Sequence, residues 1–435
     1  MKVVTTAEMR ALEQAADAAG HSYAAMMDLA GRAVAEAIVA QAGVAGGAEG
    51  ARVLILVGPG NNGGDGLVAA RYLHGWGHEC TVYVWKRQAE GDPLLERVRE
   101  EGIPTVWAKD DDGRRLATLA DECDVLVDAL LGTGAAGPLR GTLRALLERV
   151  GRAVAERRAP RPPRWEALGL PPQQEAETGR VPLVVAVDGP SGLDFDTGAI
   201  DEAALSADLT VTFGCPKLGQ FTFPGAARLG TLLVADIGLR AELTAPLPTE
   251  VAMPALVRSL LPKRSADAHK GTFGRALVVG GSSNYVGAPC LAAEGAYRCG
   301  AGLVTLAVAE RIQPIAAAHL AEATYLLLPH DLGAITEEAL KVLAEAIDGY
   351  NALLVGPGLG TEERTGGFVR GLVGAGGAAS RRAVGFAARS EPLAPAGPLP
   401  LPPLVLDADA LNLLAQQEGW WERLPAETVI TPHPG

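Results

Sequence analysis

Apolar residues recur along the chain in two alternating patterns, short unbroken runs and longer segments with helical spacing. The segment Thr5–Ala19 opens with the spacing of a capping box and predicts a helix, and 23–40 predicts a second helix. The unbroken run 53–57 predicts a buried strand, which leads through a glycine-rich turn into a helix-like segment from Leu67. This order of strand, loop and helix is typical of an α/β unit.

The same order recurs through the rest of the chain. In the first half, further strands are predicted at 80–85, 124–128, 183–188, 208–213 and 231–236. In the second half, they are predicted at 275–281, 302–308, 324–328, 352–356 and 404–407. Because these runs are almost continuously apolar, they predict parallel sheets that are covered by helices on both faces.

The periodicity lapses and prolines gather between 241 and 268, so we place a domain boundary there. The sequence predicts one α/β domain over 1–242 and a second over 243–435. Two stretches, 151–180 and 366–403, are rich in Arg and Pro or in Gly, Ala and Pro, and they are predicted to be surface insertions.

Composition narrows the class of protein. The 435 residues are 48% hydrophobic and carry a net charge of −13, which excludes a disordered chain and argues against general binding to nucleic acids or anionic membranes. No run of about 18 apolar residues predicts a membrane span, and the start lacks the features of a signal peptide, so we expect a cytoplasmic protein. The five cysteines are scattered without a CxxC pair and are expected to be buried thiols.

The glycine-rich turn after the first strand, GPGNNGGDG at 58–66, is the first candidate site. Its GxGxxG pattern alone is weak, because the chain has Lys86 and Arg87 where a dinucleotide-binding fold would have an acidic residue. These two residues could favour a 2′-phosphate or form a solvated strand end. Two amides and a carboxylate among four glycines favour a binding function, the alternative being an elaborate turn.

Two further predicted strands end in aspartate followed by glycines, at Asp128 and Asp188. Because parallel strands end at the same edge of a sheet, these carboxylates should meet in one crevice, although either could instead cap the next segment. Carboxylate, hydroxyl and amide oxygens gathered there would suit a hard cation.

These motifs, in this order, resemble the bifunctional NAD(P)H-hydrate repair enzymes, over nearly the whole chain. In the first half the resemblance rests on TTAEMRALEQ, MMDLAGRAVAEA, GPGNNGGDG, VDALLGTG and AVDGPSGLD. In the second half it rests on HKGTFGRALVVGGS, GAPCLAAEGAYRCGAGLVTLAV, VGPGLG, VLDADALNLL and TPHPG. The resemblance implies a Rossmann-like epimerase domain followed by a ribokinase-like dehydratase domain that uses ADP or ATP.

For the first domain, the resemblance implies that two loops and Asp188 bind hydrated NADH or NADPH. The loop residues are Asn61, Asn62, Gly63, Gly64, Asp65, Gly132, Thr133, Gly134, Ala135, Ala136, Gly137 and Pro138. It also implies a potassium ion at Asn62, Asp128 and Ser191. Asp188 is the candidate catalytic acid or base, since inversion of the hydrated C6 centre requires proton transfer.

For the second domain, the resemblance implies a hydrated-nucleotide pocket lined by Ala288, Gly360 and His433, with Lys270 and Gly271 near its entrance. His433 could instead be a neutral surface histidine. Asp407 and Asp409 follow a predicted strand and are expected to be structural.

The sequence ends within TPHPG, whereas the family continues through a nucleotide-binding loop and a GTGD motif. We therefore expect weak or absent dehydratase activity and an exposed sheet edge in the second domain, which would be incomplete. Two alternatives remain at this stage, a ribokinase-like small-molecule kinase and a nicotinamide-nucleotide-binding module without catalysis. The resemblance also implies a small-molecule substrate and a homo-oligomer.

Overall fold

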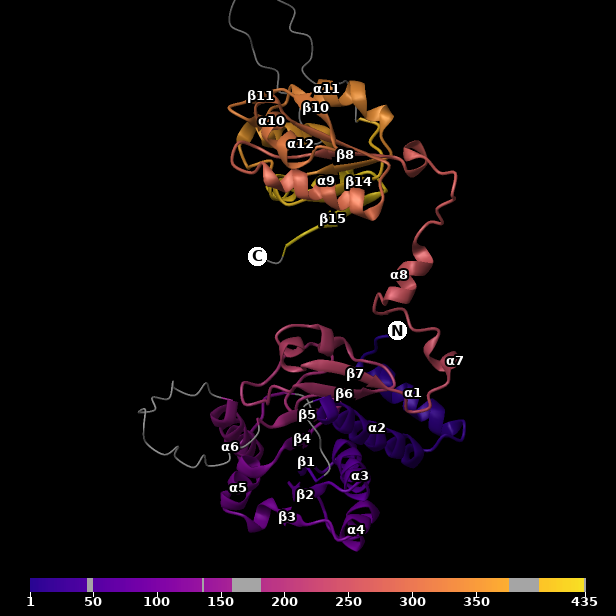
Figure 1. Cartoon of the computed structure of the whole chain (residues 1–435), viewed down its shortest axis with the longest axis vertical. Coiled ribbons are helices and arrows are strands. Elements are labelled where there is room, and N and C mark those ends of the chain that lie inside the picture. The colour runs from indigo at the N-terminus through magenta and orange to yellow at the C-terminus, as the bar shows by residue number, and fades with distance from the viewer. Residues whose placement is uncertain (45–49, 135–136, 159–180, 375–398, 434–435) are drawn as a thin grey trace, which may run out of the picture. The chain divides into compact units, whose positions relative to one another are not determined.

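The computed structural model describes residues 1–44, 50–134, 137–158, 181–374 and 399–433 (Figure 1). The chain divides into two compact units, Met1–Leu261 and Pro262–Gly435. The segment that contains Val251, which the sequence analysis places in the second domain, pairs with the amino terminus. There the amide of Val251 donates to the carbonyl oxygen of Met1 over 2.8 Å. This segment therefore folds with the first unit.

A parallel sheet of seven strands forms the centre of the first unit, in the order β3-β2-β1-β4-β5-β6-β7. The strands are β1 (Arg52–Val57), β2 (Glu79–Val84), β3 (Thr105–Trp107), β4 (Val125–Ala129), β5 (Leu183–Val187), β6 (Leu209–Phe213) and β7 (Thr231–Ala235). β1 pairs with both β2 and β4, so the direction in which strands are added reverses between β1 and β4. In open α/β sheets such a reversal opens a crevice at the carboxyl ends of the strands, where ligands bind.

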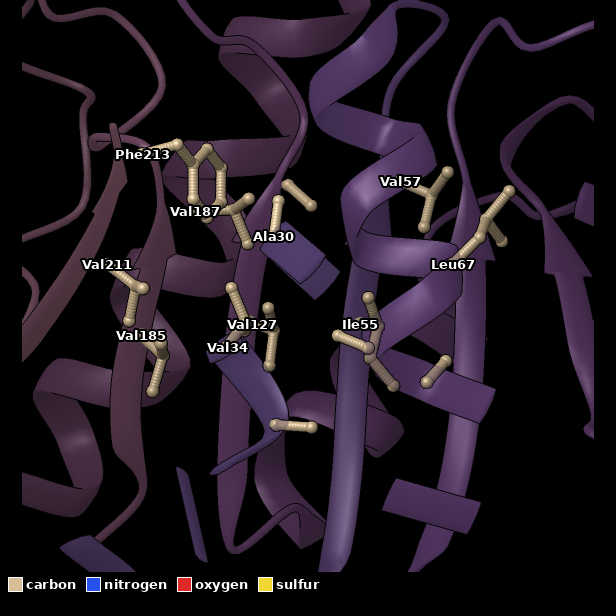
Figure 2. Packing of buried hydrophobic residues seen from close by; sticks show 14 of the residues in the cluster. Ala30, Val34, Ile55, Val57, Leu67, Val127, Val185, Val187, Val211 and Phe213 are labelled. Carbon is tan, nitrogen blue, oxygen red and sulfur yellow. The ribbon is translucent and has the colours of Figure 1, made fainter. Parts of the chain in front are cut away.

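Helices cover both faces of this sheet (Figure 1). They are α1 (Thr6–Ala18), α2 (Tyr23–Val44), α3 (Asn61–Gly75), α4 (Pro93–Glu100), α5 (Arg114–Glu122) and α6 (Gly141–Arg158), followed by the short α7 (Ala241–Thr244) and α8 (Pro254–Leu260). On one face, Val34 of α2 and Leu67 of α3 are buried with Ile55 and Val127 of the strands (Figure 2). On the other face, α5 and α6 enclose a second cluster around Leu147. Each such aliphatic side chain stabilises the layers by about 1.5–3 kcal/mol.

The second unit is built on a parallel sheet of six strands, in the order β10-β9-β8-β13-β14-β15. The strands are β8 (Arg275–Val279), β9 (Leu303–Ala309), β10 (Thr324–Leu328), β13 (Ala352–Val355), β14 (Leu404–Asp407) and β15 (Thr428–Thr431), and β11 (His330–Asp331) and β12 (Ala334–Ile335) form a separate hairpin. The helices are α9 (Gly287–Cys299), α10 (Gln313–His319), α11 (Ala339–Ala346), α12 (Glu363–Leu372) and α13 (Asp409–Leu414). Ala293 of α9 and Phe368 of α12 belong to different core clusters, one on each face of the sheet.

The predicted fold class, two α/β domains built on parallel sheets, is confirmed. The sequence analysis missed β3, β15 and the hairpin of β11 and β12. None of these gives an unbroken buried run: the residues of β3 are only partly buried, and Val429 and Ile430 of β15 are exposed. None of the helices in the described ranges is long and apolar enough to cross a bilayer.

Three predicted boundaries are wrong. The helix after β1 begins at Asn61 rather than at Leu67, so most of the expected turn is helical. Residues 151–158 belong to α6 rather than to an insertion, and Ala153 and Val154 are buried there. Residues 366–372 likewise belong to α12. Glycine and arginine made these segments look irregular, but tertiary burial of their apolar faces outweighs the weak helix propensity of glycine. The remainder of both expected insertions, 159–180 and 375–398, lies outside the described residues.

Candidate functional site

Glycines shape the crevice between β1 and β4 in the first unit. A Cβ at Gly58, directly after β1, would lie 1.7 Å from the carbonyl oxygen of Leu130, and one at Gly66 would lie 2.5 Å from the Cβ of Ala129. Any larger residue would therefore force α3 away from the end of β4. Gly60 is the N-cap of α3 and provides no side-chain cap, so the first amides of the helix can receive an anion.

The two predicted substrate loops meet at this crevice. The first, Asn61–Asp65, forms the opening turns of α3, and the Asn62 side-chain amide donates to the carbonyl oxygen of Leu131 over 3.0 Å. The second loop begins at Gly132, where a Cβ would lie 3.1 Å from the side chain of Asn62. The second loop is also reached from α1, where Arg10 donates to the carbonyl oxygen of Thr133 over 3.2 Å. Of the remaining residues in this loop, Ala135 and Ala136 lie outside the described residues.

Of the two basic residues after β2, Arg87 contacts this crevice, whereas Lys86 is exposed. Arg87 forms an ion pair with Asp92 at 2.5 Å and donates to the carbonyl oxygens of Gly58 and Gly60 at 3.2 and 2.9 Å. Its guanidinium group therefore stabilises the turn before α3 and does not extend into solvent from the end of the strand. Lys86 lies over the ring of Trp85 at 5.0 Å.

The three predicted potassium ligands lie close together through a network of hydrogen bonds. Asp128, at the end of β4, is fully buried, and its carboxylate accepts from the hydroxyl and the amide of Ser191 over 2.6 and 2.8 Å. The same hydroxyl oxygen accepts from the amide of Leu131 over 2.9 Å, and the carbonyl of Leu131 is the acceptor for Asn62. These contacts connect the ends of β4 and β5 to the start of α3.

The donor set suits a monovalent cation that prefers oxygen ligands. It offers a carboxylate, a hydroxyl, a side-chain amide oxygen and the nearby carbonyl of Leu131. Burial raises the pKa of Asp128, and the hydrogen bonds from Ser191 act in the opposite direction. A bound cation would compensate this buried negative charge, because the hydrogen-bond donors to Asp128 within the described ranges are all neutral. No group of three His, Cys, Asp or Glu side chains in these ranges could form a metal site of the usual kind.

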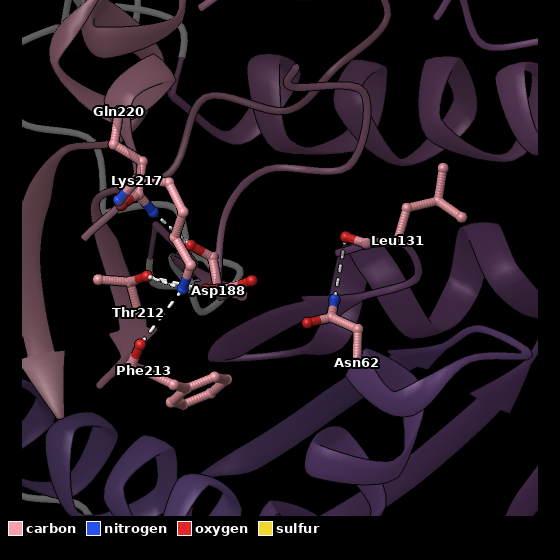
Figure 3. Close-up of polar contacts among 7 residues, drawn as sticks. All are labelled: Asn62, Leu131, Asp188, Thr212, Phe213, Lys217 and Gln220. Atoms are coloured by element: carbon pink, nitrogen blue, oxygen red, sulfur yellow. Dashed lines mark hydrogen bonds and ion pairs between the residues drawn. The ribbon is translucent and has the colours of Figure 1, made fainter. Parts of the chain in front are cut away.

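Asp188 follows β5 in a backbone conformation that is unusual for a residue other than glycine, with φ at 62°. Its amide donates to the carbonyl oxygen of Val211 over 2.7 Å, and its carbonyl oxygen accepts from the side chain of Gln220 over 2.7 Å. The carboxylate Oδ1 accepts from Thr212 over 2.8 Å and from Lys217 over 2.6 Å (Figure 3). The surrounding contacts thus fix both the backbone and one oxygen of Asp188.

Lys217 approaches Asp188 from the loop that follows β6. The side chain is 2% exposed, and its ammonium group also donates to Thr212 and to the carbonyl oxygen of Phe213 over 2.9 and 3.3 Å. A charged lysine is rarely buried to this extent unless it is paired. In Figure 3, Lys217, Thr212 and Gln220 gather on one side of Asp188, while Asn62 lies on the other.

Two more carboxylates surround this ion pair. Asp65 is only 8% exposed and receives no hydrogen bond from the described residues. Burial, and after it the nearby charge of Asp188, therefore raises the pKa of Asp65 well above its ordinary value. Burial also raises the pKa of Glu13 on α1, and the charge of Lys217 opposes that shift. The first unit therefore places several acidic groups and one buried ammonium group at a single sheet edge.

In the second unit, the predicted pocket residues also lie at one sheet edge. Ala288 lies in the first turn of α9, which follows β8, while Gly360 follows β13 and His433 follows β15. A Cβ at Gly358 would lie 3.0 Å from that of Ala288, so the loop after β13 contacts the start of α9. The amide of Gly360 donates to Asp409 over 2.9 Å, which supports the structural role expected for that carboxylate.

The structure does not bring Lys270 and Gly271 to this edge. They form a short turn before β8, and a Cβ at Gly302, just before β9, would lie 1.7 Å from the carbonyl oxygen of Lys270. They thus lie at the amino ends of the parallel strands, and their expected place at the pocket entrance is wrong for this unit.

A cavity of about 520 Å³ in the first unit involves other residues. It is lined by α6 and by the segment 202–206, with Arg152, Arg158 and Arg228 at its wall. Arg158 is paired with Asp208, which precedes β6. The cavity therefore adjoins the amino ends of β5 and β6, away from the carboxyl ends where Asp128 and Asp188 lie.

Comparisons with known proteins agree with this division of the chain. Residues 23–219 match the profile of the YjeF-related protein N-terminus, and residues 276–435 match that of NAD(P)H-hydrate dehydratase. The bifunctional NAD(P)H-hydrate repair enzyme of Moorella thermoacetica is 35% identical over 100% of this chain and 74% of its own length. That of Thermofilum pendens is 32% identical over 100% of this chain and 73% of its own length. The chain belongs to the family of bifunctional NAD(P)H-hydrate repair enzymes.

The comparison with solved structures also gives a limited match to this family member. The ADP/ATP-dependent NAD(P)H-hydrate dehydratase of Bacillus subtilis, co-crystallised with ATP and Mg²⁺, is 29% identical and has a TM-score of 0.27. The match covers 41% of this chain and 51% of the Bacillus chain.

For this member of the family, the sequence analysis missed the residues that surround Asp188. Thr212 lies on β6, and Lys217 and Gln220 lie in the loop after it. The available signal was a lysine directly after a buried strand and a proline, in FGCPKLGQF. That signal does not reveal that the side chain turns inward, because exposed lysines after strands are common.

Proposed function

We propose that the first unit interconverts the R and S epimers of hydrated NADH and NADPH. The observation that carries this proposal is the Asp188 carboxylate, which Lys217 and Thr212 fix beside the crevice formed by α3 and the end of β4. The substrate is a hemiaminal hydrated at C6 of the nicotinamide ring, so inversion requires proton transfer to the leaving hydroxyl or at the ring. A carboxylate in a crevice is suited to exchange that proton.

We assign the hydrated nucleotide to the two loops that meet at this crevice. The proposed contacts are Asp188 and the loop residues Asn61, Asn62, Gly63, Gly64, Asp65, Gly132, Thr133, Gly134, Ala135, Ala136, Gly137 and Pro138. The uncapped amides at the start of α3 support this assignment, because a helix N-terminus stabilises an anion such as the pyrophosphate of the substrate.

A potassium ion is the proposed cofactor of the first unit, with Asn62, Asp128 and Ser191 as its ligands. When bound, it would supply the positive charge that the buried Asp128 carboxylate lacks. These three ligand residues connect the second loop to the ends of β4 and β5, and they thereby fix the position of that loop in the binding crevice.

The second unit is proposed to dehydrate the S epimer to NADH or NADPH at the expense of ADP or ATP. The match of residues 276–435 to the NAD(P)H-hydrate dehydratase profile supports this assignment. Ala288, Gly360 and His433 are the proposed contacts to the hydrated nucleotide. We also propose, from the family resemblance, a homo-oligomer located in the cytoplasm; light scattering after size-exclusion chromatography tests the assembly.

The epimerase proposal is tested with the R epimer of hydrated NADH that remains after an S-specific dehydratase and ADP have consumed the S epimer. With that helper present, addition of the protein and potassium should restore NADH absorbance. Asp188→Asn should lower the rate by about 10²- to 10⁴-fold, as expected for loss of a general acid or base. Asp236→Asn, an exposed carboxylate after β7, is the matched control and should retain the full rate.

The binding of hydrated NADH to both variants, measured by calorimetry, separates catalysis from binding. Retained binding with lost turnover in Asp188→Asn supports the acid or base assignment. Unchanged turnover in that variant contradicts it, and a folded wild-type protein without turnover favours a binding module. Omission of the helper, with the S epimer and ADP supplied, measures the dehydratase directly. ADP formation from ATP and a small-molecule alcohol, without NADH formation, would favour a kinase.

A further inference from the structure

Lys217 is the most unusual charged residue in the described part of the first unit. It is among the largest fully buried side chains, and its ammonium group donates to three acceptors: Asp188 Oδ1, Thr212 Oγ1 and the carbonyl oxygen of Phe213. All three donors of the ammonium group are therefore used. Burying a charge is costly unless such partners compensate it, so the position of this side chain is strongly determined.

The contacts divide the two oxygens of Asp188 between two environments. Oδ1 accepts from both Lys217 and Thr212, at 2.6 and 2.8 Å, whereas Oδ2 accepts no hydrogen bond from the residues that the structure describes. Gln220 and Val211 fix the backbone on either side. Rotation of the carboxylate would break two charge-assisted bonds, so Oδ2 is the oxygen that is available to a substrate.

Other charged groups face this pair from two further elements. Asp65 approaches from α3 and Glu13 from α1, and each interacts electrostatically with both Asp188 and Lys217. Arg10 of α1 opposes the charge of Glu13 at a more exposed position. Lys217 therefore places one buried positive charge among three carboxylates.

We propose that Lys217 is a positioning residue for epimerisation: it holds Oδ1 of Asp188 and thereby directs Oδ2 toward the hydrated ring. This inference rests on the proposed function of the first unit. Lys217 itself contacts Asp188 rather than the substrate.

The backbone around Lys217 is fixed independently of its ammonium group. Its amide donates to the side chain of Gln220 over 2.8 Å. On either side of it, the amide of Val4 donates to the carbonyl oxygen of Pro216, and the amide of Leu218 donates to that of Val4, both over 3.0 Å. A variant that changes only the end of the lysine side chain should therefore leave the loop in place.

The test compares loss of the charge with loss of one hydrogen bond. Lys217→Met removes the ammonium group but keeps most of the chain length, and Thr212→Val removes the hydroxyl that contacts both partners. In the full-length protein, Lys217→Met should lower kcat for epimerisation by about 10²-fold with KM changed by less than about threefold. Calorimetry should show that this variant binds hydrated NADH within about threefold of the wild-type affinity, because Lys217 contacts Asp188 rather than the substrate.

Thr212→Val should lower kcat by about tenfold and also leave KM within about threefold of the wild-type value. The matched control for the loss of a positive charge is Lys109→Met. Lys109 is exposed and follows β3, the edge strand farthest from β6, so this variant should have the wild-type rate. Circular dichroism and the melting temperature establish that each variant is folded.

The inference is overturned if folded Lys217→Met loses less than about threefold in kcat, or if its loss appears in KM rather than in kcat. If Lys217→Met does not fold, Lys217→Arg decides: its larger planar group should displace the Asp188 carboxylate and lower kcat by about tenfold with KM within about threefold, and an unchanged kcat overturns the inference. Loss of turnover in Asp188→Asn together with full activity in Lys217→Met would overturn this inference while the proposed function stands. A folded but inactive wild-type protein would overturn both.

Discussion

In both units, a glycine at the carboxyl ends of the parallel strands lets two backbone segments come into close contact, but the charged side chains around it differ. In the first unit, a Cβ at Gly58 after β1 would lie 1.7 Å from the carbonyl oxygen of Leu130. In the second unit, a Cβ at Gly356 after β13 would lie 1.7 Å from the carbonyl oxygen of Asp407. Gly58 lies where the strand order reverses, between β1 and β4, whereas Gly356 lies one strand beyond the reversal, between β13 and β14. Both glycines let a loop approach the neighbouring strand.

The two units differ in the charged side chains at the carboxyl ends of their strands. The first unit buries Asp128, Asp188 and Lys217 almost completely. In the second unit, Asp407 and Asp409 are only partly buried, and they accept from Thr431 and from a loop amide. The comparison shows that close backbone approach shapes the carboxyl ends of both sheets, whereas charged side chains are buried there, among the described residues, in the first unit alone.

The largest expected effect tests the close backbone contact that both units make through a glycine. Gly356→Ala should destabilise the second unit by about 3 kcal/mol, since the new Cβ meets a backbone carbonyl and φ is +135°. Calorimetry should show the transition of the second unit at lower temperature, with that of the first unit unchanged. Gly349→Ala, which meets no atom within 4 Å, is the control. Equal melting of the two variants would show that close approach does not determine the loop after β13.

A smaller effect tests the buried charges of the first unit. Asp128→Asn should lower the epimerase rate by at least about tenfold and remove its response to KCl relative to NaCl at equal ionic strength. The reason is that the variant loses the negative charge that a cation would neutralise. Asp236→Asn should keep the full potassium response. A potassium response that persists in Asp128→Asn would contradict the proposed cation site.

The smallest expected effect concerns the pH dependence of stability. Because burial and the charge of Asp188 raise the pKa of Asp65, the folded first unit retains a proton that the unfolded chain has lost. Stability therefore falls as the pH rises from the ordinary carboxyl range toward the raised value. Asp65→Asn removes this loss, so its melting temperature should exceed that of the wild-type protein by a few degrees at pH 8 and by less at pH 4. An equal difference at both pH values would show that Asp65 does not titrate in this way.

Local patterns were sufficient for much of the fold and for part of the site. The capping box at Thr5 and Glu8 is present, with the amide of Glu8 donating to Thr5 over 3.1 Å, because its two partners are close in sequence. Asp128 and Asp188 were found for a related reason: a strand followed by glycine places its last polar residue at the sheet edge. In parallel sheets, that edge is shared by all strands.

Contacts between distant residues were beyond local patterns. Lys217 lies 29 positions from Asp188, and Arg87 lies 29 positions from Gly58, so neither contact leaves a periodic signal. The start of α3 was misplaced because its glycines have weak helix propensity, while their value in packing depends on where β4 ends. Lys270 was misplaced because its position before β8 determines which sheet edge it joins.

The sequence by itself determined the two α/β domains, most strands and the residue types at the strand ends, because periodicity and turn chemistry act over a few residues. Only the tertiary structure decided which charges meet. In the folded protein, Lys217 is buried against Asp188, and Arg87 donates to the carbonyl oxygen of Gly58. Asp65 has no hydrogen-bond donor among the described residues. These outcomes depend on desolvation and on distances between separate strands, which arise only when the sheet has formed.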